Sequence, residues 1–126
     1  MAPYSGSIGA RVEELDAGRA RVSLRDRRAV RNHLGSVHAV ALLNLGELAS
    51  GLAMLCGLPS HARAIVVDLR AEYRKKARGR LIAECVCEPP RGDRDEELEL
   101  QAIISDEDGN EVCVVRARWK VGPRPT

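Results

Sequence analysis

The sequence predicts an α+β domain in which one long central helix is wrapped by a mostly antiparallel sheet of five to six strands. Two observations lead to this prediction. One stretch, 37–56, is rich in Ala and Leu and lacks Pro, and several later segments alternate apolar with charged residues. A sheet with one dry face needs a cover, and this helix is the available apolar element. A chain of 126 residues suits a single domain over 1–126, with about 1–9 loosely ordered.

The N-terminal part of the chain is expected to form two short strands, 10–15 and 19–24. A turn at Asp16, Ala17 and Gly18 joins them. A strongly basic segment over 25–31 and a loop then lead to the helix.

The predicted helix over 37–56 differs from an ordinary surface helix. Apolar residues occupy every side of it, whereas a surface helix shows a polar stripe. We therefore expect a helix that is buried nearly all round. Gly57 and Pro59 supply its stop signal.

Four strand-like segments make up the rest of the chain. Turn-forming residues separate them, most clearly Asp108, Gly109 and Asn110, so we expect consecutive strands to be antiparallel neighbours. Apolar residues alternate with charged ones along the first of these strands, which predicts one dry face that includes Val67 and Tyr73. The four segments are 65–75, 81–88, 97–105 and 111–121.

Composition narrows the possible partners. Apolar residues make up 44% and charged residues 30%, as in a soluble globular protein. Phe is absent, and a formal charge of +2 with few aromatic rings does not favour nucleic acid as a partner. No apolar stretch resembles a signal peptide or a membrane span, so no membrane partner is expected.

The four cysteines also bear on the cellular compartment of the protein. Cys56, Cys85, Cys87 and Cys113 lie within apolar runs, and no Cys/His spacing resembles a zinc site. Cys85 and Cys87 would share one strand face, which is a poor geometry for a structural disulfide. We expect reduced thiols, a cytoplasmic protein and no bound metal.

Polar residues of types that serve in catalysis or ligand binding lie around the start of the helix. Asn32, Gly35 and His38 form N-x-x-G-x-x-H, and Glu47 follows on the otherwise apolar helix. An ionised carboxylate there is costly unless something solvates or pairs with it. Glu47 could face a wet edge or pair with an Arg, or it could serve as a general base or nucleophile. Asn32 and His38 could position a substrate or be structural, and Gly35 would let backbone approach a ligand.

Helix geometry separates the two parts of this constellation. Glu47 follows His38 by nine residues, an advance of about 13.5 Å and a rotation of about 900°, which places them on opposite sides of the helix. If both serve one site, Glu47 must come from a second subunit across a two-fold interface.

The same residues carry a resemblance to a known family. N-x-x-G-x-x-H with an acidic residue nine places later resembles hotdog-fold thioesterases of the phenylacetyl-CoA type, whose signature runs N-x-x-G-x-x-H-G-G. The likeness covers about 32–84 and is greatest to uncharacterised hotdog thioesterases. The sequence departs from the pattern at Ala39 and Val40, which replace the paired glycines, and at Glu47, which replaces Asp.

The resemblance implies hydrolysis of an acyl-CoA or acyl-carrier thioester by a homodimer, with a tetramer as a further possibility. CoA would be part of the substrate, and no other cofactor is implied. The helix amide at Ala39 would polarise the thioester carbonyl, Asn44 and Gly51 would line the acyl pocket, and a basic group would hold the CoA phosphates: Arg74, Lys75 and Arg78. The alternatives are an acyl-CoA or fatty-acyl binding protein without catalysis and a hydroxyacyl-thioester dehydratase.

Overall fold

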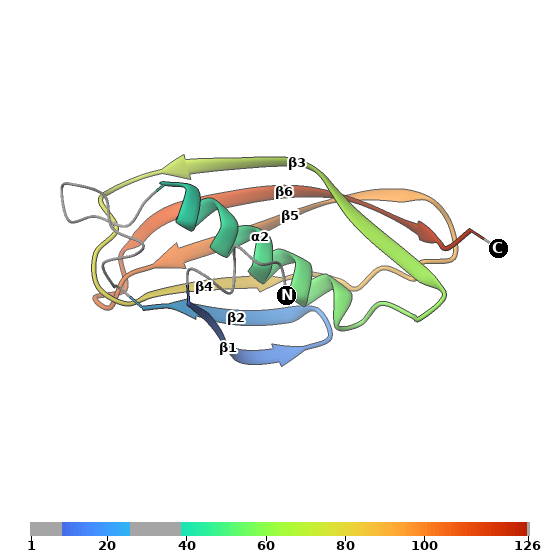
Figure 1. The fold of residues 1–126 in the computed structure, drawn as a ribbon, viewed down its shortest axis with the longest axis horizontal. Coiled ribbons are helices and arrows are strands. Elements are labelled where there is room, and N and C mark those ends of the chain that lie inside the picture. Colours follow the sequence, from blue (N-terminus) through green and yellow to red (C-terminus); the bar gives the residue numbers. More distant parts are fainter. Residues whose placement is uncertain (1–8, 26–38, 126) are drawn as a thin grey trace.

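In the computed structural model, which describes residues 9–25 and 39–125, one helix lies against the inner face of a six-stranded antiparallel sheet (Figure 1). Both the α+β class and the wrapping of the helix by the sheet are as predicted. The elements are β1 (Ala10–Asp16), β2 (Arg19–Leu24), α2 (Ala39–Leu55), β3 (Ala62–Tyr73), β4 (Leu81–Val86), β5 (Glu96–Ser105) and β6 (Glu111–Pro123). The expectations for residues 1–8, Asn32, Gly35 and His38 fall outside the described residues.

The strand order is β1-β2-β4-β5-β6-β3, which corrects one prediction. Consecutive strands pair as expected in β1 with β2, β4 with β5 and β5 with β6. β3 and β4 are not neighbours, because β3 pairs with β6 through contacts such as Leu69 with Ala117, while β4 lies between β2 and β5. The turn residues after β3 define a local bend, whereas pairing depends on long-range packing. β3 is consequently an edge strand.

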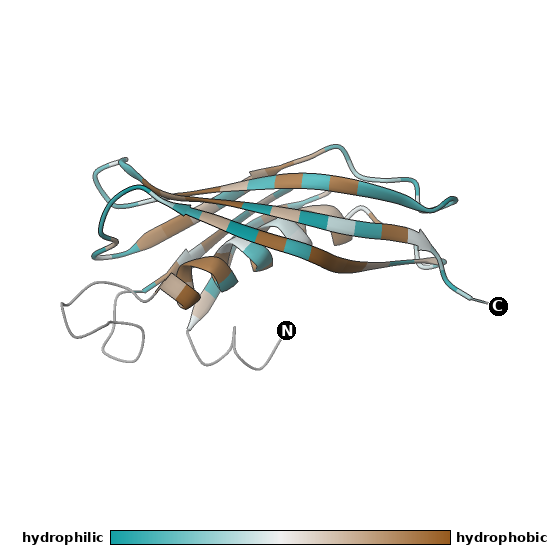
Figure 2. Cartoon of the chain, turned by 90° about the horizontal axis from the view of Figure 1, so that it is seen from above, coloured by the Kyte–Doolittle hydropathy of each residue, from teal (hydrophilic) through white to brown (hydrophobic). Residues whose placement is uncertain are grey.

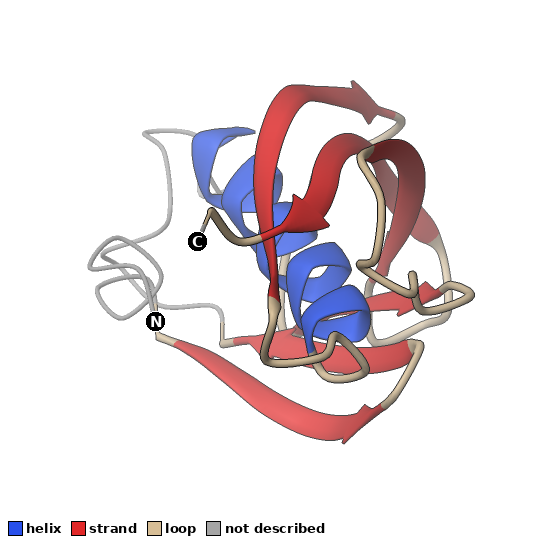
Figure 3. Ribbon diagram, turned by 90° about the vertical axis from the view of Figure 1, so that its right-hand side faces the viewer, coloured by secondary structure: helices blue, strands red, loops and turns tan. Residues whose placement is uncertain are grey.

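The core lies between the helix and the inner face of the sheet. Side chains alternate in polarity along the strands, as the banded colouring in Figure 2 shows, and the inward members Leu100, Ala102 and Ile104 of β5 are buried as predicted. From the helix, Leu45 and Met54 are fully buried. Figure 3 shows the helix lying against this face of the sheet. These contacts hold α2 across the sheet.

The helix packs closely on β6 because glycine leaves room for two β6 side chains. A Cβ added to Gly46 would overlap the Val115 side chain, and one added to Gly51 would lie 3.0 Å from the Trp119 ring. Both glycines therefore serve close helix-to-sheet packing.

β3 departs from the predicted alternation at Val67. The register with β6 shifts between Val66 and Asp68, which places Val67 in a β-bulge with 46% of its surface exposed. Leu69 and Ala71 return to the inner face after the bulge. A strict two-residue alternation in the sequence cannot predict this extra residue.

The prediction that the helix is buried nearly all round is wrong for one side. Sheet residues cover the face that contains Leu45 and Ala49, but Val40 is 62% exposed and Leu55 is 45% exposed. A single sheet can cover only one side of a helix. The sequence of this helix is apolar on the uncovered side as well. We call this side the open face; its members are Val40, Asn44, Glu47 and Leu55.

Candidate functional site

Glu47 lies on the open face in the middle of α2, where it is half-buried. The Asn44 side-chain amide donates a hydrogen bond to Glu47 Oε1 over 3.4 Å. Residues three apart on a helix are surface neighbours, so this contact follows from their spacing. The carboxylate is thus held by its own helix, and no Arg or Lys of the described residues forms an ion pair with it. This removes pairing with a described Arg as an explanation for the acid.

The backbone beneath Glu47 is fixed from the sheet side. Ser50, which is 1% exposed, donates from its hydroxyl to the Glu47 carbonyl oxygen at 3.0 Å. The same hydroxyl accepts from Trp119 Nε1 at 3.3 Å. A buried polar chain therefore connects β6 to the turn of helix that carries Glu47.

Gly51 was expected to leave space in an acyl pocket. In the structure the space beside Gly51 is taken by the Trp119 ring, 3.0 Å from an added Cβ. Its role is therefore helix packing. The remaining expected lining residue, Asn44, lies on the open face.

The start of the helix is tied to the end of β3. The Tyr73 hydroxyl donates to the Ala39 carbonyl oxygen at 2.9 Å. Partial burial raises the pKa of Tyr73 above its ordinary value, so the phenol remains a proton donor at neutral pH. The sequence placed Tyr73 on the dry strand face and gave no sign of this contact, because the two residues are 34 positions apart.

Ala39 and Glu47 remain separated within one chain. Glu47 follows Ala39 by eight positions, an axial distance of about 12 Å. A thioester carbonyl at the first helix amides would therefore lie beyond the reach of the same chain's Glu47. Asn32, Gly35 and His38 lie outside the described residues.

The predicted phosphate-binding group contains residues of two kinds. Arg74 is paired with Glu72 and Glu111, both at 2.9 Å, so its charge is already balanced. Lys75 and Arg78 are exposed, and they make no ion pair with any described carboxylate. Of the group, Lys75 and Arg78 are the better placed to meet an anion.

The buried cysteines are poor nucleophiles. Burial raises the pKa of Cys85 to about 12 and that of Cys113 to about 11. Both thiols are protonated at neutral pH, whereas the thiolate is the reactive form. All four cysteines are free.

Among the described residues, no group of three or more His, Cys, Asp or Glu side chains is arranged to hold a metal ion. Nor is any helix in residues 9–25 and 39–125 long and apolar enough to cross a membrane.

Comparison with known families identifies the chain. A family described as a domain of unknown function, DUF4442, matches residues 1–121. The chain belongs to the DUF4442 family. Among curated proteins, none matches the sequence.

Solved structures place this DUF4442 domain in the hotdog fold of thioesterase-like proteins. The crystal structure of genomics protein APC5556 is similar with 31% identity and a TM-score of 0.87, over 97% of this chain and 82% of that one. A Pseudomonas aeruginosa protein of unknown function, named a probable thioesterase, has 25% identity and a TM-score of 0.88, over 98% and 89%. A Haemophilus influenzae thioesterase has 17% identity and a TM-score of 0.83, over 95% and 82%, which shows the shared fold.

Proposed function

We propose that this DUF4442 protein hydrolyses an acyl thioester, of CoA or of an acyl carrier, at a site formed between two subunits. The observation that carries the proposal is Glu47, a half-buried carboxylate on the open face of α2. The names of the Pseudomonas aeruginosa and Haemophilus influenzae neighbours point to the same reaction class.

The open face supports self-association. Val40 and Leu55 expose apolar surface on the helix, and β3 at the end of the sheet has one edge without a neighbouring strand among the described residues. Exposed apolar surface beside an unpaired strand edge favours a partner that covers both. Within one chain, Glu47 and the helix start are about 12 Å apart, the rise of roughly eight helical residues. A shared site therefore needs a second copy, which would bring its Glu47 toward the first copy's helix start.

In this arrangement each subunit has a separate task. The helix start of one subunit, with Ala39 and the proposed Asn32, Gly35 and His38, would hold and polarise the thioester carbonyl. Glu47 of the other would take a proton from the attacking water and pass it to the departing thiolate, or attack the carbonyl carbon itself to form a mixed anhydride that a water molecule then hydrolyses. The carbon–sulfur bond then breaks, and the thiol leaves with a proton. No redox or metal cofactor enters this scheme.

A thiol-release assay over short, long and aromatic acyl-CoAs tests the proposal. General-base catalysis contributes about 10²–10⁴-fold, so Glu47→Gln and Glu47→Ala should lose activity by that order. Glu97→Gln is the matched control, because Glu97 is exposed and paired with Arg118 on the outer side of the sheet. Equal rates in the wild type and both Glu47 variants would remove Glu47 from the mechanism.

Acyl-thioester binding without hydrolysis is the second candidate. It is favoured by Val40, whose side chain is 62% exposed at the helix start where the resembled family has glycine. A branched side chain there narrows the approach to the first helix amides. Calorimetric binding of an acyl-CoA that the wild type leaves intact would support this candidate over hydrolysis.

Free buried thiols fit a reducing compartment, so we place either activity in the cytoplasm.

A further inference from the structure

A polar pocket lies on the outer face of the sheet, the side away from α2. Val22 and Leu24 of β2 are fully buried in the core. Ser23 lies between them and pairs in register with Arg11 of β1, so both side chains project to the opposite side. A pocket of about 330 Å³ opens there, near the low end of the roughly 300–1,000 Å³ of small-molecule sites. Its lining is Gly9, Arg11, Glu13, Ser23, Arg25 and Arg80.

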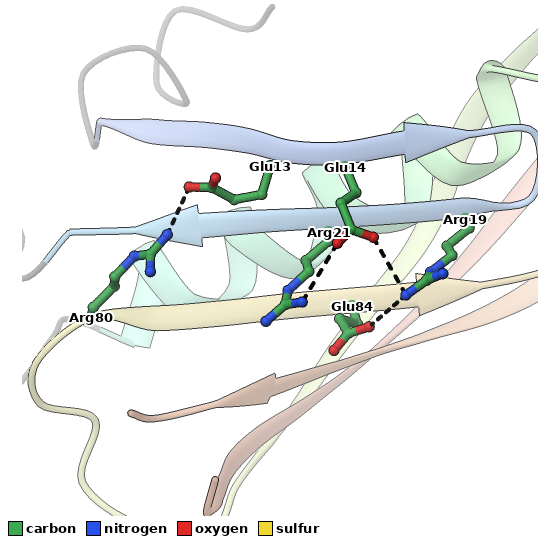
Figure 4. Close-up of polar contacts among 6 residues, drawn as sticks. All are labelled: Glu13, Glu14, Arg19, Arg21, Arg80 and Glu84. Atoms are coloured by element: carbon green, nitrogen blue, oxygen red, sulfur yellow. Dashed lines mark hydrogen bonds and ion pairs between the residues drawn. The ribbon is translucent and has the colours of Figure 1, made fainter. Parts of the chain in front are cut away.

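The floor of this pocket is a buried, organised polar contact. Ser23 is 4% exposed, and its hydroxyl donates to Glu13 Oε1 at 2.6 Å. Arg80 donates from its guanidinium to the same oxygen at 2.8 Å (Figure 4). The register of β1 against β2 shifts between Val12 and Glu14, which places Glu13 in a bulge beside Ser23. These bonds fix Arg80 at the rim of the pocket.

The charge of the pocket is unbalanced, unlike that around the neighbouring arginines Arg19 and Arg21. Three arginines against one glutamate leave a net charge of about +2. Nearby outward arginines have carboxylate partners: Arg19 pairs with Glu14 and Glu84, and Arg21 with Glu14 (Figure 4). Arg11 and Arg25, by contrast, make no ion pair with any carboxylate in the described residues.

We propose that this pocket binds a phosphate group, held by the guanidinium groups of Arg11, Arg25 and Arg80. Guanidinium presents a planar set of donors that matches phosphate oxygens in two-point contacts. Glu13 is already engaged by Ser23 and Arg80, so it orients the rim and does not cancel all three charges. The phosphate could belong to a small phosphorylated ligand or to the nucleotide of CoA. The sheet separates this pocket from Glu47, so binding here does not depend on thioester hydrolysis.

Isothermal titration calorimetry with inorganic phosphate, CoA and dephospho-CoA tests the proposal and distinguishes the two sources. If the pocket binds a phosphate of CoA, CoA should bind more tightly than dephospho-CoA. If it binds a small phosphorylated ligand, inorganic phosphate should bind as well as CoA. In either case Arg11→Gln with Arg25→Gln should weaken binding by roughly tenfold or more, because charge-assisted hydrogen bonds are lost.

Two further variants make the test specific. Glu13→Gln keeps an acceptor for Ser23 and Arg80 while removing the negative charge, so it should bind phosphate more tightly than the wild type. Arg118→Gln, on the same sheet face and paired with Glu97, should leave binding unchanged. Thermal midpoints confirm that each variant is folded. Absence of binding by the wild type, or equal binding by the wild type and the double arginine variant, would overturn the proposal.

Discussion

The Asn44 side-chain amide donates to Glu47 Oε1 at 3.4 Å, one helical turn away on the open face of α2. This contact orients the carboxylate from the same helix that carries it, while Ser50 and Trp119 fix the backbone from below. Glu47 therefore lies on a turn of α2 that is tied both within the helix and to β6.

Replacing Asn44 should affect catalysis more than stability. Asn44→Leu keeps a similar volume on a half-buried surface but removes the donor to Glu47, so we expect kcat to fall by about tenfold, the value of one hydrogen bond to a charged group. Thiol-release kinetics measure this loss. Asn110→Leu, in the exposed turn before β6, is a control for the loss of an amide elsewhere. Unchanged kcat in Asn44→Leu would mean that Glu47 needs no orienting amide.

Gly46 should tolerate no side chain because of Val115. Gly46→Ala places a Cβ into the Val115 side chain, and overpacking of this kind costs about 1–3 kcal/mol, although Ala is intrinsically the better helix former. Urea unfolding measures the change. The double variant Gly46→Ala with Val115→Ala should recover part of the loss relative to the sum of the two single changes. Strict additivity would show that the two residues do not interact.

The edge strand should be required for self-association. Val67 is 46% exposed in the β3 bulge, and a charge there opposes burial against a second copy. We expect Val67→Lys to be a folded monomer with little thiol-release activity, as measured by analytical ultracentrifugation and enzyme assay. Val86→Lys is the control, because Val86 is 73% exposed on β4, away from this edge. A fully active Val67→Lys monomer would contradict the shared site.

The buried thiols should destabilise the fold at high pH. Burial raises the pKa of Cys85 from 9.0 to about 12, with Cys87 adding a smaller effect, so the folded protein keeps a proton that the unfolded chain loses. The unfolded state binds fewer protons above pH 9.0, and the free energy of unfolding must fall as the pH rises from there toward about 12.

Urea unfolding at a series of alkaline pH values measures this slope. Cys85→Ala should make it shallower, since one group that titrates differently in the two states is gone, while Cys113 still contributes. Cys56→Ala, at an exposed position, is the matched control and should keep the wild-type slope. An equally steep slope in Cys85→Ala would assign the alkaline loss to other groups.

Local patterns predicted much of the fold. The two-residue period of Leu100, Ala102 and Ile104 located β5 and its buried side, and the Ala- and Leu-rich run located the helix. Neither pattern contains information on which distant strands pair, so the position of β3 beside β6 was missed. Periodicity likewise could not reveal the single extra residue at Val67.

The candidate site was predictable where it depends on spacing along one helix. Glu47 and Asn44 fall on one face because they are three residues apart, and the sequence singled out both. Tyr73 and Ala39 meet through tertiary packing, which no local pattern encodes. The apolar open face was interpreted as burial within the chain, because an apolar pattern does not say whose surface will cover it.

The central claim, that Glu47 and the helix start act from different subunits, is tested most directly by hybrid dimers. Two differently tagged chains, one carrying Glu47→Ala and the other Asn32→Ala with His38→Ala, are co-expressed, and the mixed dimer is isolated. Each parent homodimer should be inactive, whereas the hybrid has one intact site of two and should show about half the wild-type thiol-release rate. A purified hybrid as inactive as its parents would contradict the shared site.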